Sequence, residues 1–216
     1  MKKNLTYIIF VVDRSGSMSS IAKDMIGGYN AFIKAQKDAN AGDCKVFFYQ
    51  FDTQYDAVYE NVDINHVAEL TDKTYVPRGG TALYCSLGKT IKNIGEKLSN
   101  LNESERPERV LIATITDGED NSLLERNEIY DSEQVKEMIK HQTEKYGWDF
   151  VYIGANQNAW AVGNKMGIAG NTKLNYVASA KGTSEMFDKL SKGTLSYRSA
   201  TAKAAFAFAP EESEKV

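Results

Sequence analysis

Continuous apolar runs alternate along the chain with stretches in which apolar residues recur every three or four positions. The first pattern is typical of strands buried on both faces, and the second of helices that bury one side. The expected strands cover residues 5–12, 45–51, 55–64, 109–116, 148–153 and 173–177, and the expected helices cover 18–36, 83–98, 131–146, 156–166 and 183–199. This alternation predicts an α/β fold, a Rossmann-like three-layer open sheet that is mostly parallel, with helices on both faces.

One edge of the sheet is expected to be antiparallel. Only Thr53, Gln54 and their neighbours separate the second and third predicted strands, so a short hairpin is the natural connection between them. At 216 residues, the chain is long enough for one domain with a full core and short for two. We expect residues 1–200 to form that single domain and residues 201–216 to be a loose tail.

The composition excludes several classes of partner. Hydrophobic residues make up 42% and charged residues 25%, as in ordinary globular proteins. The net charge of −3 gives no electrostatic footprint for nucleic acid, and the longest apolar run, residues 7–12, is far shorter than the roughly 20 residues of a membrane helix. We therefore expect no nucleic-acid or membrane partner. Two cysteines are too few for a disulfide framework and favour a cytoplasmic location.

Small polar residues gather at three turns between the predicted elements. Asp13, Ser15 and Ser17 follow the first strand in the pattern Asp-x-Ser-x-Ser. Thr81 ends a Gly-Gly-Thr loop, and Asp117 follows the fourth predicted strand. In open α/β sheets ligands bind beyond the carboxyl ends of the strands, so the three clusters can converge on one point. Their hydroxyls and carboxylates are the ligands that a hard cation such as Mg²⁺ prefers.

These three pieces, in this order, resemble the metal-ion-dependent adhesion site of von Willebrand factor A (VWA) domains. The resemblance covers residues 5–199, nearly the whole chain. It is strongest with the small stand-alone bacterial and phage members, to which segments 27–32 and 146–156 add further likeness.

The resemblance implies a role for each of these polar residues. Ser15, Ser17 and Thr81 would bind Mg²⁺ or Mn²⁺ through their hydroxyls, while Asp13 and Asp117 would act mostly through bound waters. One coordination position would remain for an Asp or Glu carboxylate of a protein partner. The expected function is a metal-dependent protein-binding module and not an enzyme, and both carboxylates are expected at solvent-facing strand ends.

Other interpretations of these motifs stay open. The Asp-x-Ser-x-Ser pattern also suits a helix N-cap and turn that binds no metal. A Mg²⁺-dependent hydrolase acting on phosphate esters is the alternative function, although Ser15 stands where an enzyme with an aspartate nucleophile needs a second carboxylate. The segment 88–90, Gly-Lys-Thr, resembles the end of a phosphate-binding loop, but it lies inside a helical pattern.

The remaining charged residues near these clusters are expected on the surface. Arg14 lies between two motif residues and is interpreted as a surface residue that borders the partner site. Glu119 and Asp120 are expected to be solvated loop carboxylates. The two histidines, His66 and His141, are far from the clusters in sequence and are expected to be surface residues rather than metal ligands.

Overall fold

Six strands form one sheet in the order β3-β2-β1-β4-β5-β6 in the computed structural model, which describes residues 1–124, 129–155, 159–202 and 204–209. The strands are β1 (Lys2–Asp13), β2 (Asp43–Phe51), β3 (Tyr55–Asp63), β4 (Pro107–Thr116), β5 (Asp149–Ala155) and β6 (Lys173–Tyr176). Each neighbouring pair is parallel except β2 and β3, which are joined by a hairpin. The predicted sheet, with one antiparallel edge strand, is confirmed.

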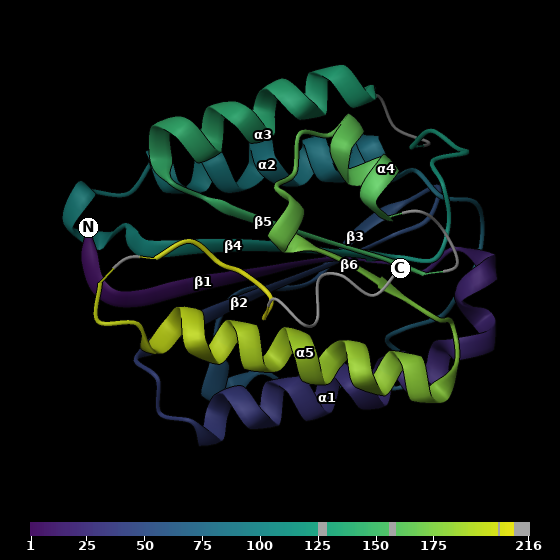
Figure 1. The fold of residues 1–216 in the computed structure, drawn as a ribbon, viewed down its shortest axis with the longest axis horizontal. Helices are drawn as coiled ribbons and strands as arrows, with labels where there is room; N and C mark the ends of the chain where they lie inside the picture. The colour runs from purple at the N-terminus through teal and green to yellow at the C-terminus, as the bar shows by residue number, and fades with distance from the viewer. Residues whose placement is uncertain (125–128, 156–158, 203, 210–216) are drawn as a thin grey trace.

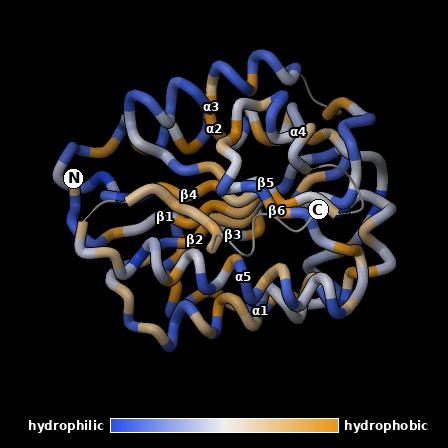
Figure 2. Tube along the Cα trace, in the orientation of Figure 1, coloured by the Kyte–Doolittle hydropathy of each residue, from blue (hydrophilic) through white to orange (hydrophobic). Residues whose placement is uncertain are grey.

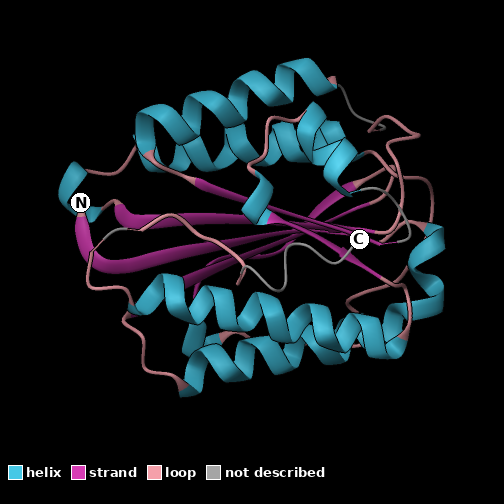
Figure 3. Cartoon of the chain, viewed as in Figure 1, coloured by secondary structure: helices cyan, strands magenta, loops and turns pink. Residues whose placement is uncertain are grey.

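Helices cover both faces of the sheet (Figure 1, Figure 3). The α-helices are α1 (Ala22–Asp38), α2 (Leu83–Ser99), α3 (Ser132–Tyr146), α4 (Ala159–Lys165) and α5 (Ala180–Ser199). Helices α1 and α5 lie on one face, and α2, α3 and α4 lie on the other. Within the described residues, no helix is long and apolar enough to cross a membrane.

Strand β1 lies near the centre of the sheet, and its alternating side chains supply two separate cores. Ile8, Phe10 and Val12 face α1 and α5, whereas Ile9 and Val11 face the opposite helices. Figure 2 shows the hydrophobic strands between two layers of helices in which hydrophilic and hydrophobic residues alternate. Burial on both faces explains why this strand appears in the sequence as a continuous apolar run.

The first predicted helix is divided in two. Residues Gly16–Ile21 form a 3-10 helix, and α1 begins only at Ala22. The 3-10 helix begins within the Asp-x-Ser-x-Ser segment. There the backbone amide of Met18 donates to the carbonyl of Ser15, three residues earlier, as is typical of the tighter 3-10 turn. The fourth predicted helix begins within residues 156–158, which lie outside the described residues, and α4 covers the rest.

The segment after Thr201, expected to be loose, instead packs against the domain at Phe206 and Phe208. Phe206 and Phe208 are buried and contact each other edge to face. The backbone amide of Phe206 donates to Asp149 Oδ1, and that of Phe208 donates to the carbonyl of Asn171, both at 2.9 Å. Two aromatic rings, spaced two residues apart among alanines, thus point into the core. Residues 210–216 lie outside the described part of the chain.

This packing makes the tail part of the stability of the domain. Phe206→Ala should lower the free energy of unfolding by about 3–5 kcal/mol, because it removes a buried ring that contacts Tyr197 and leaves a cavity. Urea denaturation measures this change. Ala207→Ser, at an exposed position of the same segment, is the control and should change little. Equal stability of the Phe206 variant and the wild type would show that the tail is not part of the core.

Candidate metal centre

The five predicted metal-site residues lie together at the carboxyl edge of the sheet. Asp13 is the last residue of β1, and Asp117 follows the end of the neighbouring strand β4. The hydroxyls of Ser15 and Ser17 lie 3.0 Å apart, and the Ser17 hydroxyl donates to Asp117 Oδ1 at 2.7 Å. Two residues about 100 positions apart in the sequence are thereby in direct contact.

Thr81 enters the same cluster from the loop before α2. A Cβ atom on Gly118 would lie 3.3 Å from the Thr81 hydroxyl oxygen, so this hydroxyl lies against the residue that follows Asp117. The Thr81 amide donates to Asn121 Oδ1 at 2.8 Å, and the Asn121 amide donates back to the Thr81 carbonyl at 3.0 Å. A side chain at position 80 would collide with Ser122, so the Thr81 loop can lie this close to residues 121–122 only with glycine at position 80.

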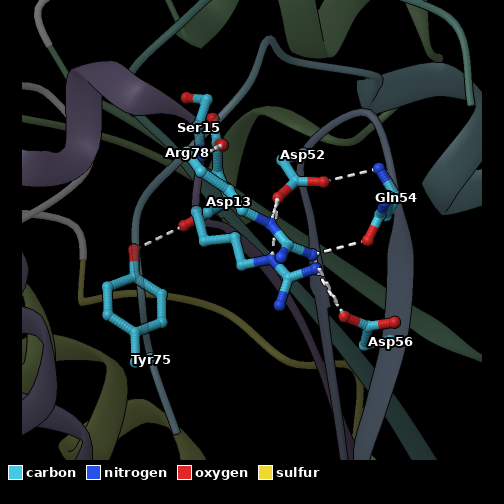
Figure 4. A network of polar contacts seen from close by, with 8 residues as sticks. Asp13, Ser15, Asp52, Gln54, Asp56, Tyr75 and Arg78 are labelled. Carbon is cyan, nitrogen blue, oxygen red and sulfur yellow. Dashed lines mark hydrogen bonds and ion pairs between the residues drawn. The ribbon is translucent and has the colours of Figure 1, made fainter. Parts of the chain in front are cut away.

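Asp13 is fully buried, with 0% of its surface exposed, which corrects the prediction that it faces solvent. Its Oδ1 accepts from the Ser15 amide and its Oδ2 from the Thr116 hydroxyl, both at 2.6 Å. Its backbone carbonyl accepts from the Tyr75 hydroxyl at 2.5 Å (Figure 4). The parallel strands beside β1 and the loop above it enclose the carboxylate, whereas Asp117 is only half-buried.

Desolvation makes both carboxylates harder to ionise. Burial raises the pKa of Asp13 to about 6, against the lowering effect of its hydrogen bonds to Thr116 and Ser15, and the charge of Asp117 raises it further. Burial also raises the pKa of Asp117. A nearby divalent cation would favour the charged forms and lower both pKa values.

The donor set fits a hard cation. The Ser15 and Ser17 hydroxyls and the Asp117 carboxylate are in hydrogen-bonding contact, with Asp13 and Thr81 beside them, and oxygen ligands of this kind suit Mg²⁺ or Mn²⁺. Among the described residues, no group of three or more His, Cys, Asp or Glu side chains is placed to hold a metal ion. Binding here would therefore depend on hydroxyl ligands. Ser15, Ser17 and Thr81 are the residues that would hold the cation directly.

An ion-pair network built around a buried Arg14–Asp52 pair, which the sequence analysis missed, lies beside this centre (Figure 4). Asp52 Oδ2 accepts from Arg14 Nε at 3.1 Å and from Arg78 Nε at 2.7 Å. Arg14 also pairs with Asp56 at 2.5 Å, and Arg78 Nη2 donates to Gln54 at 2.6 Å. Arg14 is therefore a buried structural residue, and the prediction that it lies on the surface is wrong.

This network aligns the two loops that carry the hydroxyls. The Arg78 amide donates to the Arg14 carbonyl at 2.7 Å, and the Gly16 amide donates to the Gly79 carbonyl at 3.1 Å. The Thr81 loop therefore runs directly beside the Asp-x-Ser-x-Ser turn. One signal in the sequence could have identified this network. Asp52 is an acidic residue directly after an apolar run, as Asp13 is after the run 5–12.

Other predicted residues have mixed outcomes. Asp120 is half-buried and accepts from the Tyr84 amide at 3.1 Å, so it caps the start of α2 and is not a freely solvated carboxylate. Glu119, His66 and His141 are exposed as predicted. The Gly-Lys-Thr segment at 88–90 lies inside α2, which confirms that it is not a phosphate-binding loop.

The fold and this site define an open α/β domain with a polar cluster at the carboxyl edge of its sheet. No family model and no curated protein matches the sequence. Solved VWA structures share the fold. The von Willebrand factor type A protein from Catenulispora acidiphila is 12% identical with a TM-score of 0.56, over 88% of this chain and 42% of that one. The vWF domain of the type V pili tip protein Mfa5 from Porphyromonas gingivalis is 10% identical with a TM-score of 0.60, over 93% and 98%.

Proteins with other roles share the fold as well. The PilB minor pilin from Streptococcus sanguinis is 13% identical with a TM-score of 0.57, over 88% of this chain and 61% of that chain. Proximal thread matrix protein 1 from the mussel byssus is 16% identical with a TM-score of 0.58, over 85% and 46%. The chain thus spans less than two thirds of the length of several of these proteins. The fold is VWA-like, and at these identities the likeness concerns the fold alone.

The ion-pair network gives a test of its structural role. Asp52→Asn should lower the free energy of unfolding by about 3 kcal/mol, because the buried guanidinium of Arg14 loses a charged partner. Asp56→Asn is the matched control and should cost less than about 1 kcal/mol, since Asp56 is half-exposed. Denaturant titrations of both variants provide the comparison. Equal losses would contradict the buried role of Asp52.

Asp13 predicts a pH dependence in the absence of metal. Because its pKa rises from 3.8 to about 6 on folding, the folded chain binds this proton more tightly than the unfolded chain. The stability it contributes is present below about pH 4 and is lost as pH rises through about 6, a change of about 3 kcal/mol at about 1.36 kcal/mol per pH unit. In EDTA, the difference in unfolding free energy between the wild type and Asp13→Asn should therefore change with pH. Parallel pH curves for the two proteins would refute the shift.

Proposed function

We propose that this chain is a protein-binding module that acts through a divalent cation, Mg²⁺ or Mn²⁺. Ser15, Ser17 and Thr81 bind the cation through their hydroxyls, and Asp13 and Asp117 act through bound waters. The observation that carries this proposal is the convergence of these five side chains, from three separate loops, on one point at the carboxyl edge.

The chemistry of the ligands determines what the partner provides. When bound, the cation supplies an electrophilic position that accepts an oxygen ligand. The direct protein ligands are neutral hydroxyls, so they withdraw little of the positive charge, and a hard anionic oxygen is the best further ligand. We therefore infer that the protein partner presents an Asp or Glu carboxylate.

Exposed apolar side chains around the centre favour a protein as the partner. Val76, Leu123 and Val177 are 49%, 55% and 67% exposed. Val76 directly follows Tyr75, which binds Asp13, and Leu123 follows the segment that binds Thr81. These apolar side chains would lose their exposure to water if a protein bound over the centre. The shared fold of a minor pilin and a pilus tip protein also favours binding over catalysis. The cytoplasmic location and the bacterial or phage origin remain predictions.

Isothermal titration with Mn²⁺ tests the metal centre. The wild type should bind one ion weakly, because the two carboxylates act only through water. Thr81→Ala and the double variant Asp13→Asn, Asp117→Asn should lose binding. Asp38→Ala is the control, since this exposed carboxylate ends α1 at the opposite edge of the sheet. Undiminished Mn²⁺ affinity in the double variant would remove the basis of the proposal.

The partner role needs a second measurement. Capture of binding proteins on immobilised chain should be lost in EDTA, return with Mg²⁺ or Mn²⁺, and fail when one acidic residue of the captured partner is neutralised. A partner that binds equally well in EDTA and to Thr81→Ala would show that the interface lies elsewhere. Cleavage of a phosphate ester that depends on Mg²⁺ and on Asp13 would instead favour the hydrolase.

A further inference from the structure

Tyr176, the last residue of β6, carries a buried hydroxyl that the fold does not explain. The residue is 8% exposed, and its hydroxyl has no hydrogen-bond partner among the described residues. Buried polar side-chain atoms in proteins nearly always have a partner, either in the protein or in an ordered water. The place of this hydroxyl in the fold relative to the candidate metal centre shows whether the centre could supply that partner.

The register of the sheet places Tyr176 level with Asp117. One row across β4, β5 and β6 is formed by Thr116, Gly154 and Asn175. The next row contains Ala155 paired with Tyr176, and Asp117 continues β4 at the same level. Ala155, between them on β5, has a very short side chain and packs in the same core as Tyr176.

Tyr176 lies on the same face of the sheet as the residue two positions before Asp117. Side chains two residues apart along a strand point to the same face. Tyr176 follows Leu174 by two residues, and both pack in the core that α1 and α5 cover. Asp117 follows Ile115 by two residues, and Ile115 is in that core as well. Tyr176 therefore lies on the face of the sheet to which β4 directs Ile115, and Asp117 stands one residue past the end of that strand.

The electrostatics agree with this placement. Burial raises the pKa of Tyr176, and the charges of Asp117 and Asp13 raise it further. The same two carboxylates act on Tyr75, whose hydroxyl is bonded to the Asp13 carbonyl. Tyr29 is a useful contrast, because it is buried in the same core. Its pKa is raised by burial and by its neighbours Tyr59 and Cys44, and the carboxylates of the centre are not among the causes.

We propose that Tyr176 is a further positioning residue of the metal centre, and that its hydroxyl donates to a water held by the Asp117 carboxylate. A water is required because no direct hydrogen bond joins the two residues, and a buried polar site can hold one. The hydrogen bond orients Asp117 toward the cation, as outer hydrogen bonds to metal ligands do. This inference rests on the proposed metal-binding function.

Tyr29→Phe is a matched control for Tyr176→Phe. Both tyrosines are buried, and both have a hydroxyl without a partner among the described residues. Removing either hydroxyl leaves the ring in place. Without metal, thermal unfolding in EDTA should therefore occur at nearly the same temperature in both variants and in the wild type.

The decisive measurement is Mn²⁺ affinity by isothermal titration of the folded full chain. Tyr176→Phe should weaken binding about tenfold, the lower end of the range for outer hydrogen-bond partners, while Tyr29→Phe leaves it unchanged. Unchanged affinity in Tyr176→Phe, or equal weakening in both variants, would overturn the role of Tyr176 and leave the metal centre intact. No Mn²⁺ binding by the wild type would overturn the proposed function and this inference together.

Discussion

The carboxylate of Asp13 is enclosed at the end of β1, and a buried charge requires compensation from its surroundings. The Ser15 amide supplies one hydrogen bond and the Thr116 hydroxyl another. Because Thr116 ends β4, the second bond also joins the ends of the two strands at the middle of the sheet. The carbonyl of Asp13 in turn holds the Tyr75 hydroxyl, which fixes the start of the loop that leads to Thr81. One desolvated group thereby connects a turn, a strand and a loop.

A second buried carboxylate lies one strand away and is compensated in a different way. Asp52 follows Phe51, which pairs with Asp13 across β1 and β2. Two guanidinium groups, from Arg14 and Arg78, bind Asp52, whereas the hydrogen bonds recorded for Asp13 come from neutral donors. Cationic side chains satisfy Asp52 within the protein, so its role is structural. Neutral donors do not cancel the negative charge of Asp13, so of these two buried carboxylates Asp13 is the one suited to a cation.

The sequence predicts what local patterns encode. The apolar runs and helical stripes identify the strands and helices, and the turns after them bring Asp13, Ser15, Ser17, Thr81 and Asp117 to one edge. Pairings between distant segments have no such local pattern. Asn121 holds Thr81 across 40 residues, and Tyr75 reaches Asp13 across 62. The burial of Arg14 depends on Asp52, and that of Phe206 on its packing against Tyr197 of α5. Such partners follow from the completed fold.

The loops of the centre form one connected unit. Thr81 exchanges hydrogen bonds with Asn121 in both directions, and the Ser122 amide also donates to the Thr81 carbonyl. The same segment supplies Asp120, which caps the start of α2 through the Tyr84 amide. Hydrogen bonds therefore join the backbone of Thr81, the loop that carries Asp117 and the first turn of α2. Ser17, which is exposed and bonded to Asp117, is coupled to the same unit through a single hydrogen bond. Hydrogen bonds thus join Ser17 to Asp117, Asp13 to the Ser15 turn and to β4, and the Thr81 loop to the segment after Asp117, so contacts between separate loops fix the geometry of the centre.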